Sequence, residues 1–419
     1  MAALLFISFI VLLLIGVPVA FAIAAAALLV LLKGDVKLLI LVQRMFASTD
    51  SFSLIAVPFF IFAGDLLAKG KVSKVLVEFA ESLLGMLKGG LSIVSVLAGM
   101  FFAAISGSGA ATTAAVGATL IPELKKRGYR EDSAAALIAA AGTIGVVIPP
   151  SVPMVLYAVI SEDSVNTLFR NGFIPGALMG VILVAISLYQ ARKFNYPKGK
   201  PFSVGNVLRT FKEAIWGILM PLIILGGIFS GYFTPSEAAA VAVIYAIFVS
   251  FFIYRDLDFK GLVEIMKGSA KTSAVIMIII ACSGPFGWVL ANYKIPEAIA
   301  SGVLGISTNK YVIMFLISLI ILLAGVFMET SSASIILSPV FLPLVKAMGI
   351  STVHFGILFV VGIAIGMITP PVAINLFVAS GITGLPIERI SKSVIPYLIG
   401  LIIVFFMIVY VPLLIPGLM

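Results

Sequence analysis

Residues 145–150 read Gly-Val-Val-Ile-Pro-Pro, and residues 366–371 read Gly-Met-Ile-Thr-Pro-Pro. Each proline pair lies inside an apolar run that is long enough to cross a lipid bilayer. Proline has no N–H group, and in a helix its ring clashes with the carbonyl group four residues earlier. The two stretches therefore predict two membrane helices that break near the middle of the bilayer.

The breaks leave backbone carbonyl groups without their helical partners. By position these carbonyls belong to Gly145 and Val146 in the first stretch, and to Gly366 and Met367 in the second. An unpaired carbonyl in hydrocarbon costs several kcal/mol, so something inside the protein must satisfy it. A neighbouring helix, an aqueous cavity or a bound cation would each do so, and the presence of two matching copies favours a site.

The composition is that of a protein that crosses the membrane many times. Of the 419 residues, 62% are hydrophobic and 11% are charged, and apolar runs recur along the whole chain. We expect an all-α polytopic membrane protein whose first span covers residues 4–32. The net charge of +9 comes from short basic loops, as orientation signals do, so we expect no nucleic-acid partner. A single cysteine, Cys282, and a single histidine, His354, exclude disulfide frameworks and His/Cys metal clusters.

Two further apolar runs are interrupted at their centres by polar residues. Residues 91–121 contain Ser-Gly-Ser-Gly at 106–109, and residues 311–344 contain Glu-Thr-Ser-Ser at 329–332. The arm on either side of each interruption is about 12–15 residues long, which at about 1.5 Å per residue is too short to cross a bilayer. Each run therefore predicts a re-entrant helical hairpin with its polar tip at mid-depth.

The two halves of the chain repeat the same plan. Each hairpin is followed by a broken helix, expected over residues 133–160 in the first half and over 352–380 in the second. An offset of 221 residues carries the hairpin tip and the proline pair of the first half onto those of the second. We therefore expect a first repeat over residues 1–190, a linker over 191–212 and a second repeat over 213–419.

The basic residues set the predicted orientation. The loop after the first hairpin carries Lys125, Lys126, Arg127 and Arg130, and such loops face the cytoplasm. Counting crossings from this loop puts the linker and the N-terminus in the cytoplasm and the C-terminus outside. The two hairpins then enter from opposite sides, so the repeat is inverted. Inverted repeats with discontinuous helices are typical of secondary transporters whose site lies at the membrane midplane.

Each hairpin tip and the break that faces it form a candidate site. Unwound carbonyls suit a hard cation such as Na⁺, and helix N-termini suit an anion. Hydroxyl groups in membrane helices often only bond back to the preceding turn, and that role stays open for each serine and threonine here. We expect an anion to lie between the tips, near the side chains of Ser108, Thr112, Ser151, Ser331, Ser332 and Asn375.

Charged residues are scarce near the tips. Glu329 is the only acid there, and it is either a ligand or a cap for the helix arm that follows it. We find no arginine or lysine at depth, so helix dipoles, hydroxyl groups and sodium would have to meet the charge of an anionic substrate. No deep pair of acids suggests a proton antiporter.

These motifs resemble the large membrane subunit of the tripartite ATP-independent periplasmic (TRAP) transporters. The resemblance is carried by the tip at 106–109, the break Ile-Pro-Pro-Ser at 148–151 and the stretch 366–371, and it covers the whole chain. It implies an elevator-type transporter of the bacterial inner membrane, with a periplasmic C-terminus. Its activity would be sodium-driven uptake of an organic acid anion of the C4-dicarboxylate or sialic acid class. It also implies two partners: a periplasmic substrate-binding protein and a small four-helix membrane subunit, here on a separate chain.

The predicted cation ligands are mostly backbone oxygens. The plan is similar to that of elevator-type divalent anion–sodium symporters, whose tips carry Ser-Asn-Thr, and this chain departs from that pattern. We therefore expect carbonyl groups rather than side chains to bind two sodium ions. The expected ligands are Ser106, Gly145, Ile148 and Pro150 for the first ion, and Gly366, Thr369 and Pro371 with Gly325 or Glu329 for the second.

Three other functions stay open: a sodium/anion symporter that needs no binding protein, a channel and an intramembrane enzyme. An enzyme would need Asp, His or Cys residues that converge at depth, and the sequence shows none. A channel would need a continuous polar stripe, whereas the polar residues form two separate clusters. We therefore expect no enzymatic activity and favour the transporter.

Overall fold

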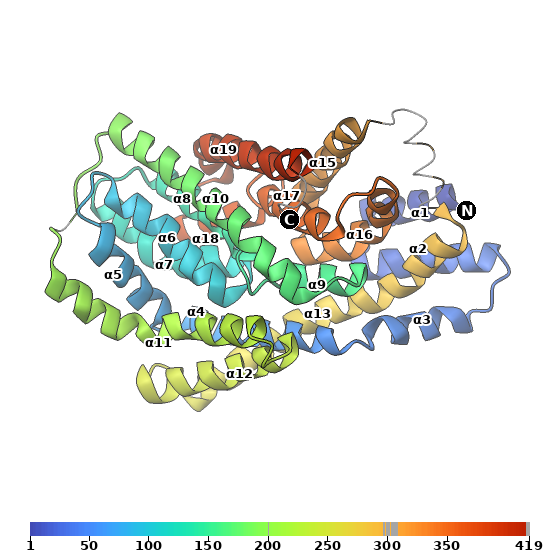
Figure 1. Ribbon diagram of the computed structural model, residues 1–419, viewed down its shortest axis with the longest axis horizontal. Coiled ribbons are helices and arrows are strands. Elements are labelled where there is room, and N and C mark those ends of the chain that lie inside the picture. Colours follow the sequence, from blue (N-terminus) through green and yellow to red (C-terminus); the bar gives the residue numbers. More distant parts are fainter. Residues whose placement is uncertain (200, 296–297, 299–301, 303–308, 416–419) are drawn as a thin grey trace.

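The computed structural model describes residues 1–419 except 200, 296–297, 299–301, 303–308 and 416–419. Every regular element in the described part is a helix (Figure 1). Eight helical segments of that part are long and apolar enough to cross a membrane, as an all-α polytopic membrane protein requires. They are Phe52–Lys69, Val165–Lys193, Val204–Phe229, Pro235–Ile253, Phe259–Asn292, Lys310–Phe327, Thr330–Ala347 and Ile387–Leu414.

Both predicted hairpins form. Helix α6 (Gly90–Ser106) contacts α7 (Gly109–Lys126), and α15 (Lys310–Phe327) contacts α16 (Thr330–Ala347). The first hairpin turns at Gly107, whose φ of +59° lies in the left-handed region that glycine adopts without strain. The polar interruptions therefore mark the turns, as predicted.

Both broken helices also form. Helix α8 (Glu131–Thr143) ends in a 3₁₀ turn, η2 (Ile144–Val146), and α9 (Val152–Ser161) resumes after the proline pair. In the second half, α17 (Thr352–Gly366) and α18 (Ile374–Thr383) flank the corresponding pair. Because proline cannot donate a backbone hydrogen bond, neither helix continues through its break.

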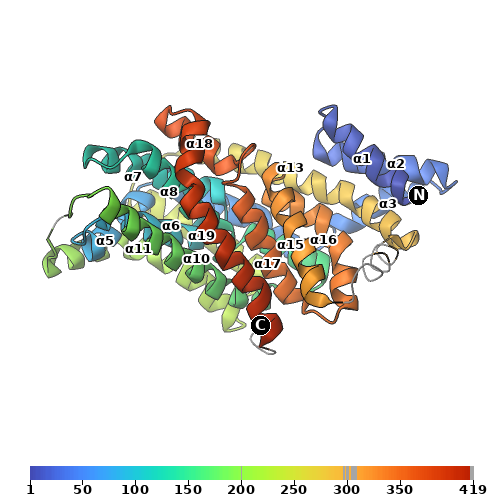
Figure 2. The same ribbon diagram turned by 90° about the horizontal axis from the view of Figure 1, so that it is seen from above.

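The two broken helices run antiparallel. Tyr157 Oη, in the second half of α9, donates to the carbonyl of Thr352 at the start of α17 (2.6 Å), and Thr352 Oγ1 donates to Asp163 Oδ1 just past the end of α9 (2.8 Å). Ser393 Oγ on α19 (Ile387–Leu414), which follows α18, donates to Asp132 Oδ2 at the start of α8 (2.9 Å). Since each hairpin ends just before its broken helix begins, the open ends of the two hairpins lie at opposite ends of this group (Figure 2). The inverted arrangement is confirmed.

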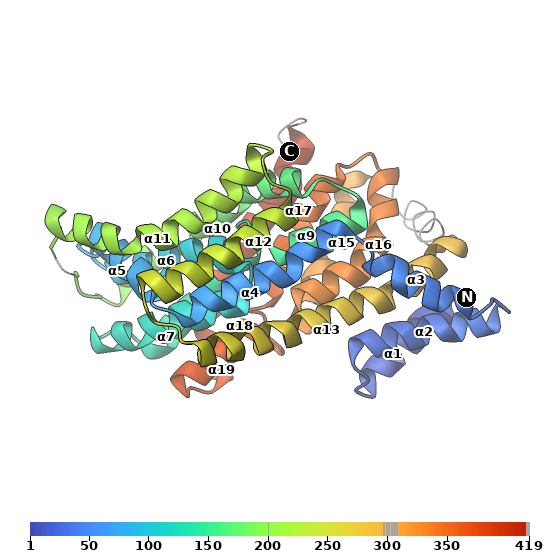
Figure 3. The same ribbon diagram turned by 90° about the horizontal axis from the view of Figure 1, so that it is seen from below.

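Helices from outside the hairpins form a wall beside them. Helix α4 (Ala56–Lys69) packs against α12 (Pro235–Phe248) and α13 (Phe259–Asn292), as Figure 3 shows. Helix α3 (Leu39–Thr49) and the short η1 (Phe52–Ile55) precede α4, and α3 also packs on α13. Helix α4 contacts α6, α7 and α9, and α13 contacts α16. We call α4 and α13 the wall helices.

The prediction of one span over residues 4–32 is wrong. The structure divides this run into α1 (Ala2–Leu14) and α2 (Val19–Lys33), which pack against each other (Figures 2 and 3). The chain turns at Gly16, whose φ is +87°, and Pro18 then precedes α2. Each helix is shorter than the roughly 20 residues that a full span needs.

Several helices are longer than their apolar runs. Helix α10 (Val165–Lys193) and α11 (Val204–Phe229) both extend into the predicted linker at 191–212. A π-helical turn, η3 (Val249–Ile253), extends α12. Hydropathy identifies only the part of a helix that lies in hydrocarbon, so it did not predict the polar ends of these helices.

The segment between α10 and α11 is fastened to the start of the first hairpin. The amide of Gly89 donates to the carbonyl of Pro197 (3.2 Å), and the amide of Gly199 donates to the carbonyl of Gly85 (2.9 Å). We call residues 194–199 the strap. The linker between the two repeats is therefore bonded through its backbone to the first repeat.

The end of the first hairpin is held to α5 (Val72–Leu84). Arg127, just after α7, binds Glu81 through Nη2 (2.6 Å) and Glu123 through Nε (2.8 Å). Burial alone would lower the pKa of Arg127, but the hydrogen bonds and charges of the two glutamates raise it above its usual value. An ion-pair network thus joins the open end of the hairpin to α5.

Candidate functional site

A cavity of about 500 Å³ lies between the two hairpin tips and the wall helices. Its polar side comes from the tips, and its wall side is largely apolar with two charged residues. The tips contribute Ser106, Ser108, Glu329, Ser331 and Ser332, and the wall helices contribute Asp65, Lys271, Val275, Ile276 and Ile279. Its size suits a small organic molecule.

A net of hydroxyl groups holds the first tip. Ser106 Oγ and Thr112 Oγ1 lie 2.8 Å apart, and Thr112 Oγ1 donates to the carbonyl of Ser108 (2.8 Å). Ser108 caps α7, because its Oγ accepts from the amide of Ala111 (3.4 Å). Ser106 and Ser108 thereby stay on the cavity wall, while Thr112 is buried behind them.

The first break packs directly against this tip. A Cβ atom on Gly145 would lie 2.6 Å from Thr112 Oγ1 and 2.7 Å from the carbonyl oxygen of Ser108, so glycine is needed here. A Cβ atom on Gly107 would lie 2.8 Å from the carbonyl oxygen of Pro150. Oxygen atoms of the tip and of the break therefore lie close together where the first sodium ion was predicted.

One of the two carbonyl groups at the first break has a partner. Ser151 Oγ donates to the carbonyl of Val146 (2.6 Å) and accepts from the amide of Met154 (3.3 Å), so it also caps α9. The prediction that Val146 is unpaired is wrong, because the serine beyond the prolines turns back to it. The carbonyl of Gly145 would need the amide of residue 149, which is Pro149 and has none. Of the two carbonyl groups, that of Gly145 is therefore the one left without a helical donor.

At the second break, both carbonyl groups have hydrogen-bond partners within the loop. The carbonyl of Gly366 accepts from the amide of Thr369 (2.9 Å), and that of Met367 accepts from the amide of Asn375 (2.9 Å). The prediction that these two carbonyls are unpaired is therefore wrong, because the loop itself supplies the donors. Each carbonyl oxygen keeps a second lone pair that can face a cation.

The second predicted sodium site is also more open than the first. A Cβ atom on Gly366 would lie 2.0 Å from the carbonyl carbon of Gly325, so α15 and α17 meet backbone to backbone. Pro371 is exposed and Thr369 is half-buried. In the first break, by contrast, Ile148 and its neighbours are buried. The two breaks share a sequence pattern but differ in enclosure.

Glu329 is a helix cap at the second tip. Its carboxylate accepts from the amides of Ser331 (2.9 Å) and Ser332 (3.2 Å), in the first turn of α16. The sequence left the role of Glu329 open between a ligand and a cap, and the structure places it as a cap. Because Glu329 also lines the cavity, its charge lies beside any molecule bound there.

The residues expected to contact an anion fall into two groups. Ser108, Ser331 and Ser332 line the cavity, whereas Thr112, Ser151 and Asn375 are buried and do not line it. Asn375 Nδ2 donates to the carbonyl of Ala139 (3.1 Å), and its Oδ1 is buried without a hydrogen-bond partner in the described part of the chain. The second group therefore supports the site from behind.

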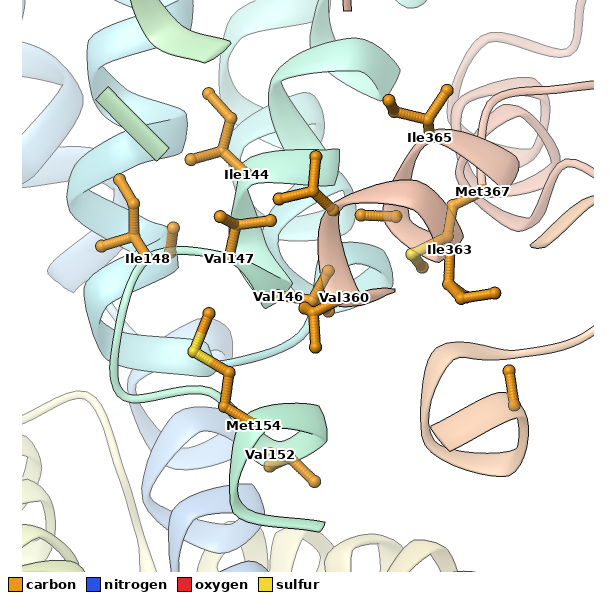
Figure 4. Close-up of a cluster of buried hydrophobic side chains, with 14 of the residues drawn as sticks. Ile144, Val146, Val147, Ile148, Val152, Met154, Val360, Ile363, Ile365 and Met367 are labelled. Carbon is orange, nitrogen blue, oxygen red and sulfur yellow. The ribbon is translucent and has the colours of Figure 1, made fainter. Parts of the chain in front are cut away.

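Met367 is a cavity residue that the sequence analysis missed. A Cβ atom on Gly109 of the first tip would lie 2.9 Å from its terminal methyl group, and Thr330 Oγ1 of the second tip lies 3.5 Å from its sulfur. Figure 4 shows Met367 with the apolar side chains of the first break, which η2 brings against α17. Met367 therefore fills the space between the two tips.

The wall helices add two charges that were also missed. Asp65 on α4 and Lys271 on α13 both line the cavity, and Asp65 Oδ2 accepts from Ser269 Oγ (2.6 Å). The expectation that the site has no arginine or lysine is wrong for this cavity, because the packing of α13 beside the hairpins brings Lys271 into its lining. No local sequence signal reports such a contact between distant segments.

Comparison with known families identifies the fold. The family described as "Tripartite ATP-independent periplasmic transporter, DctM component" matches residues 6–414. This chain belongs to the DctM family. The resemblance to TRAP transporters is thus confirmed, and the chain is a transporter permease rather than an enzyme.

Curated DctM relatives differ in the solute that their names give. The isethionate TRAP transporter permease protein of Oleidesulfovibrio alaskensis is 40% identical over 96% of this chain, which spans 63% of that relative's length. The C4-dicarboxylate large permease protein of Pseudomonas aeruginosa is 39% identical, covering 93% of this chain and 91% of its own. The sialic acid large permease protein of Vibrio cholerae is 36% identical, covering 95% and 93%.

Two solved membrane transporters share the DctM fold. The YdaH transporter of Alcanivorax borkumensis superposes with a TM-score of 0.64 at 14% identity, covering 89% of this chain and 87% of its own. MtrF of Neisseria gonorrhoeae superposes with a TM-score of 0.64 at 15% identity, covering 93% and 87%. At such low identity the likeness concerns the fold alone.

Proposed function

We propose that this DctM-family permease carries out sodium-driven uptake of a small organic anion, which binds in the cavity between the hairpin tips. The observation that carries this proposal is that α7 and α16 both begin at the cavity. The start of a helix carries roughly half a positive charge, which suits an anion. Glu329 already accepts from the Ser331 and Ser332 amides at the start of α16, so α7 would make the larger contribution. The hydroxyl groups of Ser108 and Ser332 add donors on the same side, whereas the hydroxyl of Ser331 donates to Glu329 (3.1 Å).

We place the first sodium ion at the first break, where Ser106 and the carbonyls of Gly145, Ile148 and Pro150 would hold it. This site suits Na⁺ because Gly145 lacks a helical donor and packs on the oxygen-rich tip. The second ion would lie at the second break, and its oxygen ligands would come from Gly366, Thr369, Pro371 and Gly325. The ions would supply positive charge beside the bound anion.

We further propose elevator-type movement. The hairpins and broken helices form an inverted pair that faces the wall helices across the cavity. Sliding of this group along α4 and α13 would carry the cavity from one side of the membrane to the other. The proposed orientation keeps the basic loop after α7 in the cytoplasm and places the C-terminus in the periplasm of the bacterial inner membrane. The predicted cytoplasmic N-terminus depended on a single crossing by residues 4–32, which α1 and α2 do not make, so the same count now places the N-terminus on the periplasmic side.

Two protein partners complete the proposed system. A periplasmic substrate-binding protein would deliver the anion, and a small four-helix membrane subunit would pack beside this permease. Membrane lipid would cover the remaining apolar surface, such as Ile399, Ile403 and Met407 on α19, each about half exposed. We propose a C4-dicarboxylate or a sialic acid as the solute, because relatives carry those names.

Uptake by proteoliposomes tests the proposed function. Vesicles holding the permease and its small subunit are given labelled succinate or N-acetylneuraminate, with or without an inward sodium gradient and the binding protein. We expect uptake against a concentration gradient only when sodium and the binding protein are both present. Uptake with sodium alone would favour a symporter that needs no binding protein. Sodium-independent flux that rises linearly with concentration would favour a channel and refute the proposal.

A further inference from the structure

Three charged residues line the cavity between the hairpin tips: Asp65, Lys271 and Glu329. The two acids have partners, because Asp65 accepts a hydrogen bond from Ser269 and Glu329 caps α16. Lys271 has no hydrogen bond or ion pair with any residue that the structure describes. Lys271 is therefore the one basic side chain of this lining, and it forms no ion pair with either acid among the described residues.

Lys271 stands at the end of the face that α13 turns toward the cavity. Val275 and Ile279 follow it at helical intervals of four and also line the cavity, so the three side chains lie on one face of α13. Lys267, one turn earlier on the same helix, is exposed and does not line the cavity. The face is thus an apolar strip that ends in a single cation.

An anion in the cavity would be held from two sides. The helix starts and the hydroxyl groups face it from the tips, and an ammonium group faces it from the wall. The lysine ammonium is a compact point charge with three hydrogen-bond donors on a flexible stem. It can therefore donate to a carboxylate or to a sulfonate equally well. Building on the proposed function, we propose that Lys271 is the side chain that recognises the charge of the transported anion.

The position of Lys271 makes this contact one-sided. It belongs to a wall helix and not to the hairpins, so an anion that moves with the hairpins leaves Lys271 behind. In the proposed orientation Lys271 lies in the half of α13 nearer the cytoplasm. Lys271 therefore strengthens binding at the cytoplasmic face and leaves binding at the periplasmic face unchanged.

The test uses the permease with its small subunit in proteoliposomes, and succinate, isethionate and N-acetylneuraminate as probes. Lys271→Met removes the charge, Lys271→Arg keeps it, and Lys267→Met is the matched control. Exchange assays give the half-saturating probe concentration at each face. We expect Lys271→Met to raise it about tenfold at the cytoplasmic face only, which corresponds to about 1.4 kcal/mol. Lys271→Arg and Lys267→Met should stay within about twofold of the parent protein.

Each other result has a defined meaning. An unchanged half-saturating concentration in Lys271→Met overturns the proposal, and loss of the small subunit on purification would then assign Lys271 to that interface. A tenfold rise at both faces overturns the one-sided contact. If the parent protein exchanges none of the three probes, the proposed function itself fails. Lys271→Gln, which keeps a polar group, replaces Lys271→Met if the latter does not reconstitute.

Discussion

Replacing Gly366 by alanine should force α15 and α17 apart. The new Cβ atom would lie 2.0 Å from the carbonyl carbon of Gly325 and 2.2 Å from its oxygen, whereas ordinary contact begins at 3.4 Å. The two helices must therefore separate by more than about 1 Å, since both partners are backbone and neither can rotate away. Overpacking of this kind typically costs 1–3 kcal/mol, and the backbone contact places Gly366→Ala near ~3 kcal/mol.

Gly381→Ala is the matched control, because a Cβ atom on Gly381 of α18 meets nothing within 4 Å. Alanine is a better helix former than glycine by about 0.5–1 kcal/mol, so this control should be neutral or slightly stabilising. Thermal unfolding of the purified protein in detergent measures both. We expect Gly366→Ala to lower the Tm by about 3–6 °C relative to Gly381→Ala.

Equal Tm values for the two variants would refute the reasoning, because they would show that α15 and α17 do not meet at Gly366. A second readout separates packing from cation binding. Since Gly366 belongs to the proposed second sodium site, Gly366→Ala should also raise the sodium concentration that gives half-maximal uptake. Gly381→Ala should leave that concentration unchanged.

Three further predictions address the tips and the orientation. Uptake by the parent protein should depend on sodium with a Hill coefficient above one, and Gly145→Val should raise the sodium requirement; a hyperbolic dependence would contradict two ions. Glu329→Ala should lose about 1 kcal/mol of stability with its helix cap, whereas Glu329→Gln keeps an accepting oxygen and should lose less, and equal losses would argue against capping. Cysteines at Lys126 and Ala347, in a Cys282→Ala background, should react with an impermeant maleimide from opposite sides of the membrane. Labelling from one side would exclude the inverted repeat.

The hairpins and the broken helices could be predicted from the sequence because the residues that end or turn a helix act locally. A proline pair stops a helix wherever the chain goes afterwards, and a polar tetrad between short apolar arms leaves few alternatives to a turn. Because an offset of 221 residues relates the two halves, the hairpin and broken helix predicted in one half supported the same prediction in the other. These are the features that place Ser108 and Ser331 at the cavity.

The misses arise where the outcome depends on packing. Residues 4–32 have Ser8 as their only polar residue, and Gly16 and Pro18, which mark the turn, lie inside one continuous apolar run and were therefore overlooked. The partner of the Val146 carbonyl is the hydroxyl of Ser151, which reaches it only because the chain folds back after the prolines. Lys271 is far in sequence from both tips, and only the contact between α13 and α16 brings it near them.

The strap at residues 194–199 bears on how the two repeats can be separated. Its backbone bonds to Gly85 and Gly89 tie it to the first repeat, so it travels with that half of the molecule. Phe202, a few residues later, is about half exposed. A chain divided after Phe202 would leave the strap and its hydrogen bonds to Gly85 and Gly89 intact on the first fragment. The two halves could then be produced as separate polypeptides that assemble in the membrane. A cut inside the strap would instead disrupt these backbone hydrogen bonds and leave the start of the first hairpin without that support.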